Sequence, residues 1–131
     1  MTARKPHTSE AELEVLKVLW QRGPSTVRDV DAELKSQGKN WAYNTILTFL
    51  RRLTEKGYVE TEKKQAAYVF HARVTQKQLL QQRLQELVEQ VCDNASLPLV
   101  NALIDGARLS AEDVSRLREL LDEIDPTEPP A

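Results

Sequence analysis

Residues 41–53 read WAYNTILTFLRRL, and the pattern of apolar and polar residues in this stretch predicts a helix with two different faces. On a helix with about 100° per residue it gathers four apolar side chains on one side: Ile46, Phe49, Leu50 and Leu53. The opposite side carries one aromatic side chain together with amide, hydroxyl and guanidinium groups. These residues are Trp41, Asn44, Thr45, Thr48, Arg51 and Arg52. These polar groups are of the kinds that bind base edges and phosphates in the major groove. The stretch therefore predicts a helix with one face for a core and another for nucleic acid.

A polar helix face is more often simply solvated, so the neighbouring elements decide between the two interpretations. A capping box at residues 9–12 opens a helix that a Gly-Pro pair at residues 23–24 ends. A Ser-Thr pair at residues 25–26 then caps a short helix with apolar residues at i, i+3 and i+7, which Gly38 stops. Two helices thus precede the helix that begins at Trp41.

After Lys56 the pattern changes from helical to alternating. Residues 58–62 and 67–71 favour β-structure, and residues 63–66 join them, which predicts a two-stranded hairpin with Lys63 and Lys64 at its tip. A lone hairpin is marginal in water, so it must pack on the helices before it. Three helices followed by a hairpin is the order of a winged helix-turn-helix, in which the tip lysines lie beside the same groove as the third helix.

The rest of the chain is predicted to be helical. Helices start at capping residues Thr75, Ser96 and Ser110, and the first carries leucines with 4, 3, 4 spacing that suits packing on a partner helix. So short a segment rarely closes its own core, so we expect a second copy to cover its apolar residues. The candidate interface residues are Leu80, Leu84, Leu87, Val91, Leu99, Leu103, Leu117 and Leu121.

The fold class expected is mainly α with a small β-hairpin wing. We expect four segments: a flexible arm at 1–8, a winged-helix DNA-binding domain at 9–74, a helical dimerisation domain at 75–124, and a disordered tail at 125–131. Charge follows this division, because residues 1–75 carry a net +4 and residues 76–131 a net −6. A basic half and an acidic half indicate two separate tasks, one of them facing an anion.

Several classes of protein are disfavoured. No apolar run approaches the ~18–20 residues of a membrane span, and the N-terminus lacks the apolar region of a signal peptide, so we expect a cytoplasmic protein. The single cysteine, Cys92, excludes an intrachain disulfide and any paired-cysteine metal site, and His7 and His71 have no ligand neighbours. No glycine-rich phosphate loop or catalytic constellation is present. We therefore expect no metal, no cofactor and no enzyme activity.

Several motifs resemble those of one family of bacterial regulators. They are TSEAELEVLKVLW, GPSTVRDV, WAYNTILTFLRRLTEKGYV, AYVFHARV and LSAEDVSRLRELLDE, which together extend over about residues 8–123. The chain thereby resembles the penicillinase repressor (BlaI/MecI/CopY) family. The resemblance implies a homodimer on a palindromic DNA operator, dimerised by its C-terminal helices, that represses genes such as a resistance function or its own operon.

The resemblance also implies which residues meet DNA. The matching recognition-helix positions are Ala42, Tyr43, Asn44, Thr45, Thr48 and Arg51, to which the helical pattern adds Arg52, with the wing near Lys63 and Lys64. Ala42 stands where many relatives have a serine cap, so the helix start needs another partner, either Asn40 or a bound phosphate.

Two departures from the family bear on its inducing signal. Members that answer β-lactams are cut by a membrane sensor protease at an Asn-Phe bond, where this chain has Ala102-Leu103. The copper-responsive branch carries C-terminal C-x-C pairs, which a chain with one cysteine lacks. The resemblance implies a membrane sensor protease as a partner and Ala102-Leu103 as the corresponding cleavage position, but this pair departs from the Asn-Phe bond and counts against cleavage by that route. The inducing signal stays unassigned.

A second interpretation comes from another class of protein. A winged-helix module could use the same basic face to bind an acidic protein without DNA. Steep salt dependence and preference for one duplex over a scrambled one separate DNA readout from this alternative.

Overall fold

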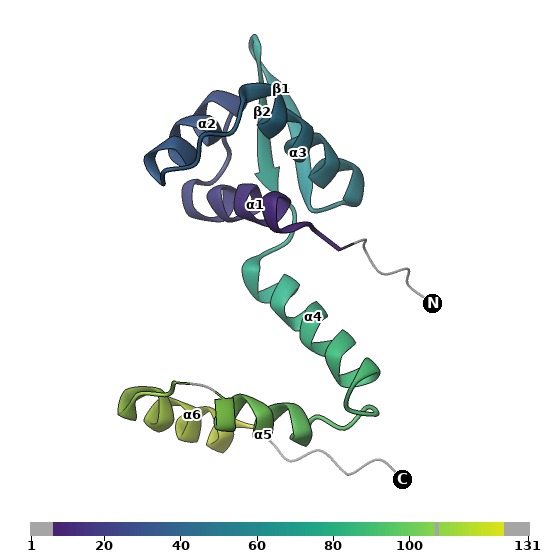
Figure 1. Cartoon of the computed structure of the whole chain (residues 1–131), viewed down its shortest axis with the longest axis vertical. Coiled ribbons are helices and arrows are strands. Elements are labelled where there is room, and N and C mark those ends of the chain that lie inside the picture. Colours follow the sequence, from purple (N-terminus) through teal and green to yellow (C-terminus); the bar gives the residue numbers. More distant parts are fainter. Residues whose placement is uncertain (1–6, 107, 125–131) are drawn as a thin grey trace. The chain divides into compact units, whose positions relative to one another are not determined.

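The structure is a computed structural model that describes residues 7–106 and 108–124. Most of the expected arm and all of the expected tail lie outside the described residues. The elements, labelled in Figure 1, are α1 (Glu10–Arg22), α2 (Val27–Ser36), α3 (Tyr43–Lys56), β1 (Val59–Lys64), β2 (Ala67–Ala72), α4 (Gln76–Gln90), α5 (Leu97–Gly106) and α6 (Ala111–Glu123). The mainly α architecture with one hairpin is therefore confirmed. Among the described helices, none is both long and apolar enough to cross a membrane.

Four of the predicted helix starts are made by side-chain caps. The Ser9 hydroxyl accepts a hydrogen bond from the Glu12 amide at 3.1 Å. Reciprocal capping boxes, in which each side chain binds the other residue's amide, are formed by the pairs Thr26 with Asp29, Thr75 with Gln78, and Ser110 with Asp113. Each box satisfies two amides that the first helical turn leaves unpaired, which fixes where the helix begins.

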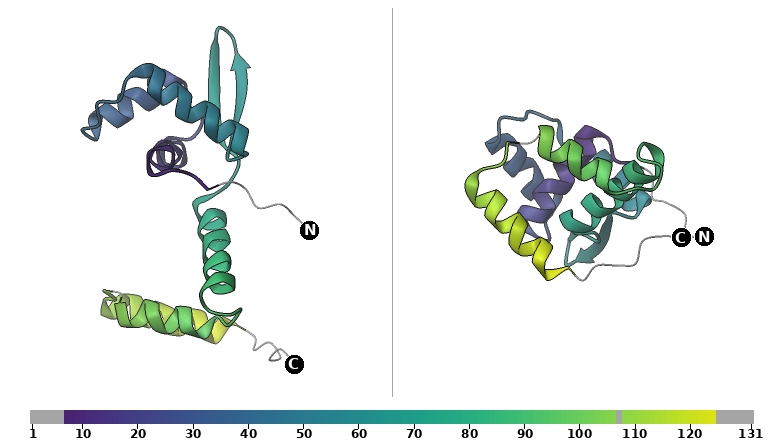
Figure 2. Two further views of the ribbon diagram at one scale, coloured as in Figure 1. Left: turned by 45° about the vertical axis from the view of Figure 1, so that its right-hand side comes forward. Right: turned by 90° about the horizontal axis from the view of Figure 1, so that it is seen from below.

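The hairpin is attached to the helices through its second strand. Ser25, in the turn between α1 and α2, exchanges two backbone hydrogen bonds with Phe70 of β2, of 2.9 and 2.8 Å. Figures 1 and 2 show the hairpin alongside α3, with its turn projecting beyond the three helices. The tertiary support that an isolated hairpin lacks is thus present.

The turn of the hairpin is tighter than predicted. β1 runs on to Lys64, which pairs with Ala67, and Gln65 takes a left-handed conformation with φ 56°. The prediction that residues 63–66 form the loop was wrong. The turn has only two residues, and the sequence there lacks the Asn-Gly or other Gly-containing pair that usually signals so short a turn. Lys63 and Lys64 are therefore strand residues, and each has a defined face.

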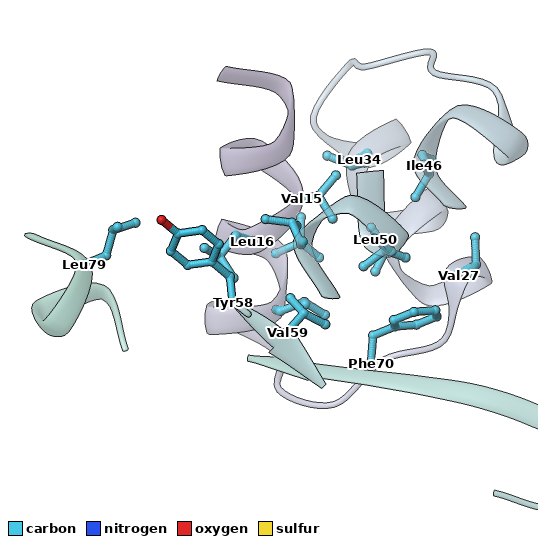
Figure 3. Packing of buried hydrophobic residues seen from close by; sticks show 14 residues of the cluster. Val15, Leu16, Val27, Leu34, Ile46, Leu50, Tyr58, Val59, Phe70 and Leu79 are labelled. Carbon is cyan, nitrogen blue, oxygen red and sulfur yellow. The ribbon is translucent and has the colours of Figure 1, made fainter. Parts of the chain in front are cut away.

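One core joins the three helices to the hairpin. The buried face of α3 consists of Ile46, Leu50 and Leu53, all 0% exposed. Figure 3 shows that Leu79, from the start of α4, points toward the ring of Tyr58, which is 1% exposed. The first compact unit accordingly ends at Arg83, two turns into α4, and residues from Leu84 onward form the second. The functional boundary expected after residue 74 stays a prediction.

Trp41 was wrongly placed on the polar face of the third helix. The helix begins at Tyr43, and the Trp41 ring packs edge-on against Phe49 with centroids 5.6 Å apart. The Lys39 ammonium lies 5.6 Å from the Trp41 ring centroid and forms an ion pair with Glu14 at 2.6 Å. A large aromatic ring is stabilised more by such packing than by exposure on a helix surface. Trp41 thus packs at the entrance to α3 and is not part of the exposed polar face of the helix.

A buried ion pair links the start of α1 to the end of α3. The Glu12 carboxylate, with its side chain 4% exposed, accepts hydrogen bonds of 2.8 and 2.9 Å from the Lys56 ammonium. Burial alone raises the pKa of Glu12, but the hydrogen bonds and charge of Lys56 and the Ser9 contacts outweigh it. The net pKa lies below the ordinary value of 4.5.

This pair predicts acid sensitivity. Because the pKa of Glu12 is lowered by folding, its contribution is complete above pH 4.5 and is lost as the pH falls through the lower folded value. The Glu12→Gln variant should lose roughly 1–3 kcal/mol at neutral pH and show a shallower loss of stability below pH 4.5. Urea unfolding across this pH range measures both effects. An acid-induced loss as steep as that of wild type would rule out this role for Glu12.

Candidate nucleic-acid interface

The solvent-facing side of α3 carries the polar residues that the sequence pattern placed there. Tyr43 is 47% exposed. The other predicted DNA-binding residues within α3 are exposed as well, namely Asn44, Thr45, Thr48, Arg51 and Arg52. The buried residues Ile46, Leu50 and Leu53 hold the helix from the other side. The division of α3 into a core face and a polar face is therefore confirmed, and its role in binding DNA stays a prediction.

The start of α3 has no side-chain cap. Ala42 occupies the N-cap position, and no side chain there accepts a hydrogen bond from the first turn. The Thr48 hydroxyl donates a hydrogen bond to the Asn44 carbonyl at 2.9 Å, and a hydroxyl oxygen that donates one hydrogen bond can still accept another. The exposed start of α3 thus offers the side-chain amide of Asn44, the hydroxyl and methyl of Thr48, and first-turn backbone amides that no side chain at the N-cap position binds.

The two wing lysines point to opposite faces of the hairpin. In the register, Lys63 lies opposite Tyr68, and its ammonium is 5.8 Å from the centroid of that ring. These residues share their face with Phe70, which contributes to the core. Lys64 lies on the other face and approaches Glu62 at 4.0 Å. The structure therefore separates two residues that the sequence analysis treated as equivalent.

An open groove of about 700 Å³ runs between the start of α2, one side of α3 and the wing. Its lining combines aromatic, aliphatic and charged side chains, including Arg28, Tyr43, Leu47, Arg51, Glu55 and Tyr68. Of the predicted DNA-binding residues only Tyr43 and Arg51 line it, whereas Asn44, Thr45, Thr48 and Arg52 lie elsewhere on the exposed surface of α3. Arg28 and Tyr68 were missed by the sequence analysis, because neither lies on the helix whose pattern it followed.

The charges around the groove are largely free to meet an anion. Within the described part of the chain, Arg28, Arg51 and Lys63 make no ion pair with any carboxylate. The opposite face of the hairpin differs, because Glu60 there pairs with His71 at 2.8 Å and Arg73 at 3.2 Å. Glu55 is the one carboxylate residue in the groove lining. The groove side of the wing is therefore the cationic side.

Comparison with known proteins identifies one family of repressors. A family model described as "Penicillinase repressor" matches residues 8–123. The chain is 27% identical over 118 residues to the penicillinase repressor of Bacillus licheniformis, covering 90% of this chain and 91% of that protein. It is 24% identical over 113 residues to the methicillin resistance regulatory protein MecI of Staphylococcus aureus (strain N315), covering 86% and 91% respectively.

A solved structure supports the fold of the N-terminal unit. The solution structure of the DNA binding domain of the repressor BlaI is similar to this chain with a TM-score of 0.51 and 32% sequence identity. The match covers 59% of this chain and 93% of that domain. The part of the chain that folds as three helices and a hairpin is therefore a winged helix.

Proposed function

The chain belongs to the penicillinase repressor family, and from this premise we propose that it is a transcriptional repressor that binds a specific duplex DNA sequence through α3. The observation that carries the proposal is the exposed row of Asn44, Thr48 and Arg51 above a fully buried apolar face. A helix held rigidly on one side and rich in hydrogen-bonding groups on the other suits the major groove.

The polar residues divide between two roles. Asn44 and Thr48, with Ala42, Tyr43 and Thr45 around the helix start, are placed to meet base edges and so to supply specificity. Amide side chains favour adenine, and a threonine methyl favours the methyl of thymine. The cations Arg51 and Arg52, with Lys63 of the wing, are proposed to meet phosphates, which supply affinity without sequence preference. Lys64 was grouped with Lys63 from the sequence, but it lies on the other face of the hairpin beside Glu62.

The proposed repressor is a homodimer. Helices α5 and α6 have no buried residue among those described, and Leu103, Leu117 and Leu121 are 60%, 38% and 66% exposed. On α4 and just beyond it, the predicted seam is also exposed, at Leu80, Leu84, Leu87 and Val91. With Leu99, these residues form the proposed interface with a second copy. Two winged helices in one dimer call for two half-sites about 34 Å apart, or a multiple of that, on a palindromic operator.

Relief of repression is proposed to act on the second unit. Ala102 and Leu103 lie in α5 and are exposed, which supports them as the position at which a membrane sensor protease would act. Cleavage there would cut through the proposed dimer interface and so release the operator. The regulated genes are proposed to include a resistance or stress-response function.

Substitutions on α3 test the proposed readout. We expect Asn44→Ala and Thr48→Ala to lose about 1–3 kcal/mol of discrimination between the preferred duplex and duplexes changed at the contacted base pair. Competition binding against a panel of single-base-pair variants gives the value. Lys63→Ala is the contrasting variant, because loss of a phosphate contact should weaken all duplexes alike. Uniform losses from all three variants would refute base readout by α3 and favour binding of an acidic partner through general charge.

A further inference from the structure

The contacts of the winged helix continue into the start of α4. Only residues 73–75 separate β2 from α4, and two of them are tied back to the winged helix. The Arg73 amide donates to the Tyr58 carbonyl at 2.9 Å, and the Trp20 indole donates to the Val74 carbonyl at 2.8 Å. The chain therefore enters α4 along a defined path.

Two further contacts hold α4 beyond its start. Leu79 is 6% exposed and belongs to the hydrophobic core of the winged helix (Figure 3). One turn later, the Arg83 guanidinium donates a hydrogen bond of 2.6 Å to the Thr8 hydroxyl, which lies in the segment just before α1. Lys56, at the end of α3, holds the same segment by donating to the His7 carbonyl at 3.0 Å. Arg83 thus ties α4 to a segment that is itself attached to α3.

The Arg83 contact constrains the direction of α4 more than the contacts at the start of the helix do. Arg83 lies seven residues beyond Gln76, which is about 10 Å along the helix axis. At that distance from the start of α4, about 1 Å of slack permits a rotation of only about 6°. Without this contact, α4 is freer to swing about its start while Leu79 stays packed.

The proposed dimer seam lies on another face of the same helix. Leu79 and Arg83 are one turn apart and so share one face of α4. The seam residues lie about 90° away around the helix axis, and they start inside the first compact unit, where Leu80 is 56% exposed. The seam consists of Leu80, Leu84, Leu87 and Val91. In the proposed dimer, the direction of α4 therefore decides where one winged helix lies relative to the other.

We propose that Arg83 is a positioning residue: by holding α4 at Thr8, it fixes the separation and rotation of the two winged helices and so selects the spacing of the operator half-sites. The inference rests on the proposed dimeric repressor, and it assigns part of the specificity to a residue that touches no base. One extra base pair moves a half-site about 3.4 Å along the duplex and turns it by about 35°. A helix held to within about 6° can distinguish such a change.

Binding to duplexes of graded spacing tests the proposal. The half-site is taken from the duplex that the full-length wild-type chain selects from a randomised DNA pool. Two inverted copies are placed at centre-to-centre separations that change by one base pair at a time. Wild type should bind one separation best and lose about tenfold in affinity one base pair away from it. Arg83→Ala should reduce this loss by about threefold or more, as expected when one hydrogen bond is removed.

A duplex with a single half-site separates positioning from damage to the winged helix. Arg83 is not among the residues proposed to meet DNA, and salt screens its charge, so Arg83→Ala should bind this duplex within about twofold of wild type. Thermal unfolding of each variant checks that the fold is intact. The matched control, Lys77→Ala, removes the same charge from an exposed position on α4 and should keep the spacing profile of wild type.

The partner residue provides an independent test. Thr8→Val removes the acceptor of the hydrogen bond but keeps the charge of Arg83, so it should broaden the spacing preference as much as Arg83→Ala does. The double variant should broaden it no further, because both substitutions remove the same bond. Additive effects of the two substitutions would show that the residues act separately and would overturn the inference.

The outcomes separate this inference from the proposed function. If Arg83→Ala keeps the spacing profile of wild type, or if wild type binds every spacing equally, Arg83 does not select the spacing, although α3 still reads each half-site. A clear loss of affinity for the single half-site in Arg83→Ala would also overturn the inference, because the residue would then act on the winged helix itself. If wild type does not prefer the selected duplex to a scrambled duplex of equal length and composition, the proposed function fails and the inference fails with it.

Discussion

A chain carrying Leu121→Asp is expected to sediment as a monomer, whereas we expect wild type at the same concentration to sediment as a dimer. Leu121 is 66% exposed on α6, near Leu117 and Ile124, which are 38% and 62% exposed. Burying an unpaired carboxylate among such residues costs far more than the association of one leucine gains. The same variant should bind a two-half-site duplex about 100-fold or more weakly, because the second winged helix is no longer held at high effective concentration.

The control for this substitution is Ser115→Asp. Ser115 is exposed on the polar side of α6. Its replacement by Asp therefore adds the same charge to the same helix, but outside the proposed interface. Sedimentation velocity should report a dimer for Ser115→Asp and a monomer for Leu121→Asp. A dimer that persists in both would place the interface on another surface.

The second large effect is expected in the core of the winged helix. Leu50 is 0% exposed on α3, and Leu50→Ala should lower the free energy of unfolding of this unit by about 2–5 kcal/mol, through lost apolar burial and the cavity that remains. Because both tryptophans, Trp20 and Trp41, belong to this unit, their fluorescence during urea unfolding reports on it. Measurements at one fixed protein concentration keep any contribution from association constant.

Arg52→Ala is the control on the same helix. Arg52 is exposed, so its replacement should change the free energy of unfolding by less than about 0.5 kcal/mol. If Leu50→Ala were as mild as Arg52→Ala, the face of α3 that includes Leu50 would not be the one packed in the core, and the assignment of the opposite face to DNA would lose its basis.

Most helix boundaries and the orientation of α3 followed from local sequence. Caps such as Thr26 and Ser110 act within one turn, so the residues that form them are adjacent in the chain and can be recognised there. The buried set Ile46, Leu50 and Leu53 follows from helical periodicity, which needs no knowledge of what covers it.

The groove could not be predicted in this way. Its walls come from α2, α3 and β2, and their approach depends on the packing of Phe70 and on its pairing with Ser25. The faces of Lys63 and Lys64 depend on how far β1 extends, which the sequence around Gln65 did not signal. Trp41 was misplaced because the pattern assigns an angle to each residue but does not fix where the helix starts.

Together these features give the N-terminal unit a consistent physical account. The core fixes α3 from behind, Trp41 and Lys39 fix its entrance, and the hairpin lies beside it with a cationic side facing the groove. As a result, the exposed face of α3 and the groove side of the hairpin present their charged and hydrogen-bonding groups on a single surface. We expect this surface to recognise a DNA sequence.

The most direct test is the ratio of the dissociation constants of the wild-type chain for its selected duplex and for a scrambled duplex, measured over a range of salt concentrations. We expect a preference of about 10³-fold or more for the selected duplex at physiological salt. The affinities for both duplexes should fall steeply as salt rises, because phosphate contacts release counterions. A ratio near one at every salt concentration, whatever the affinity, would show that the surface does not recognise a DNA sequence.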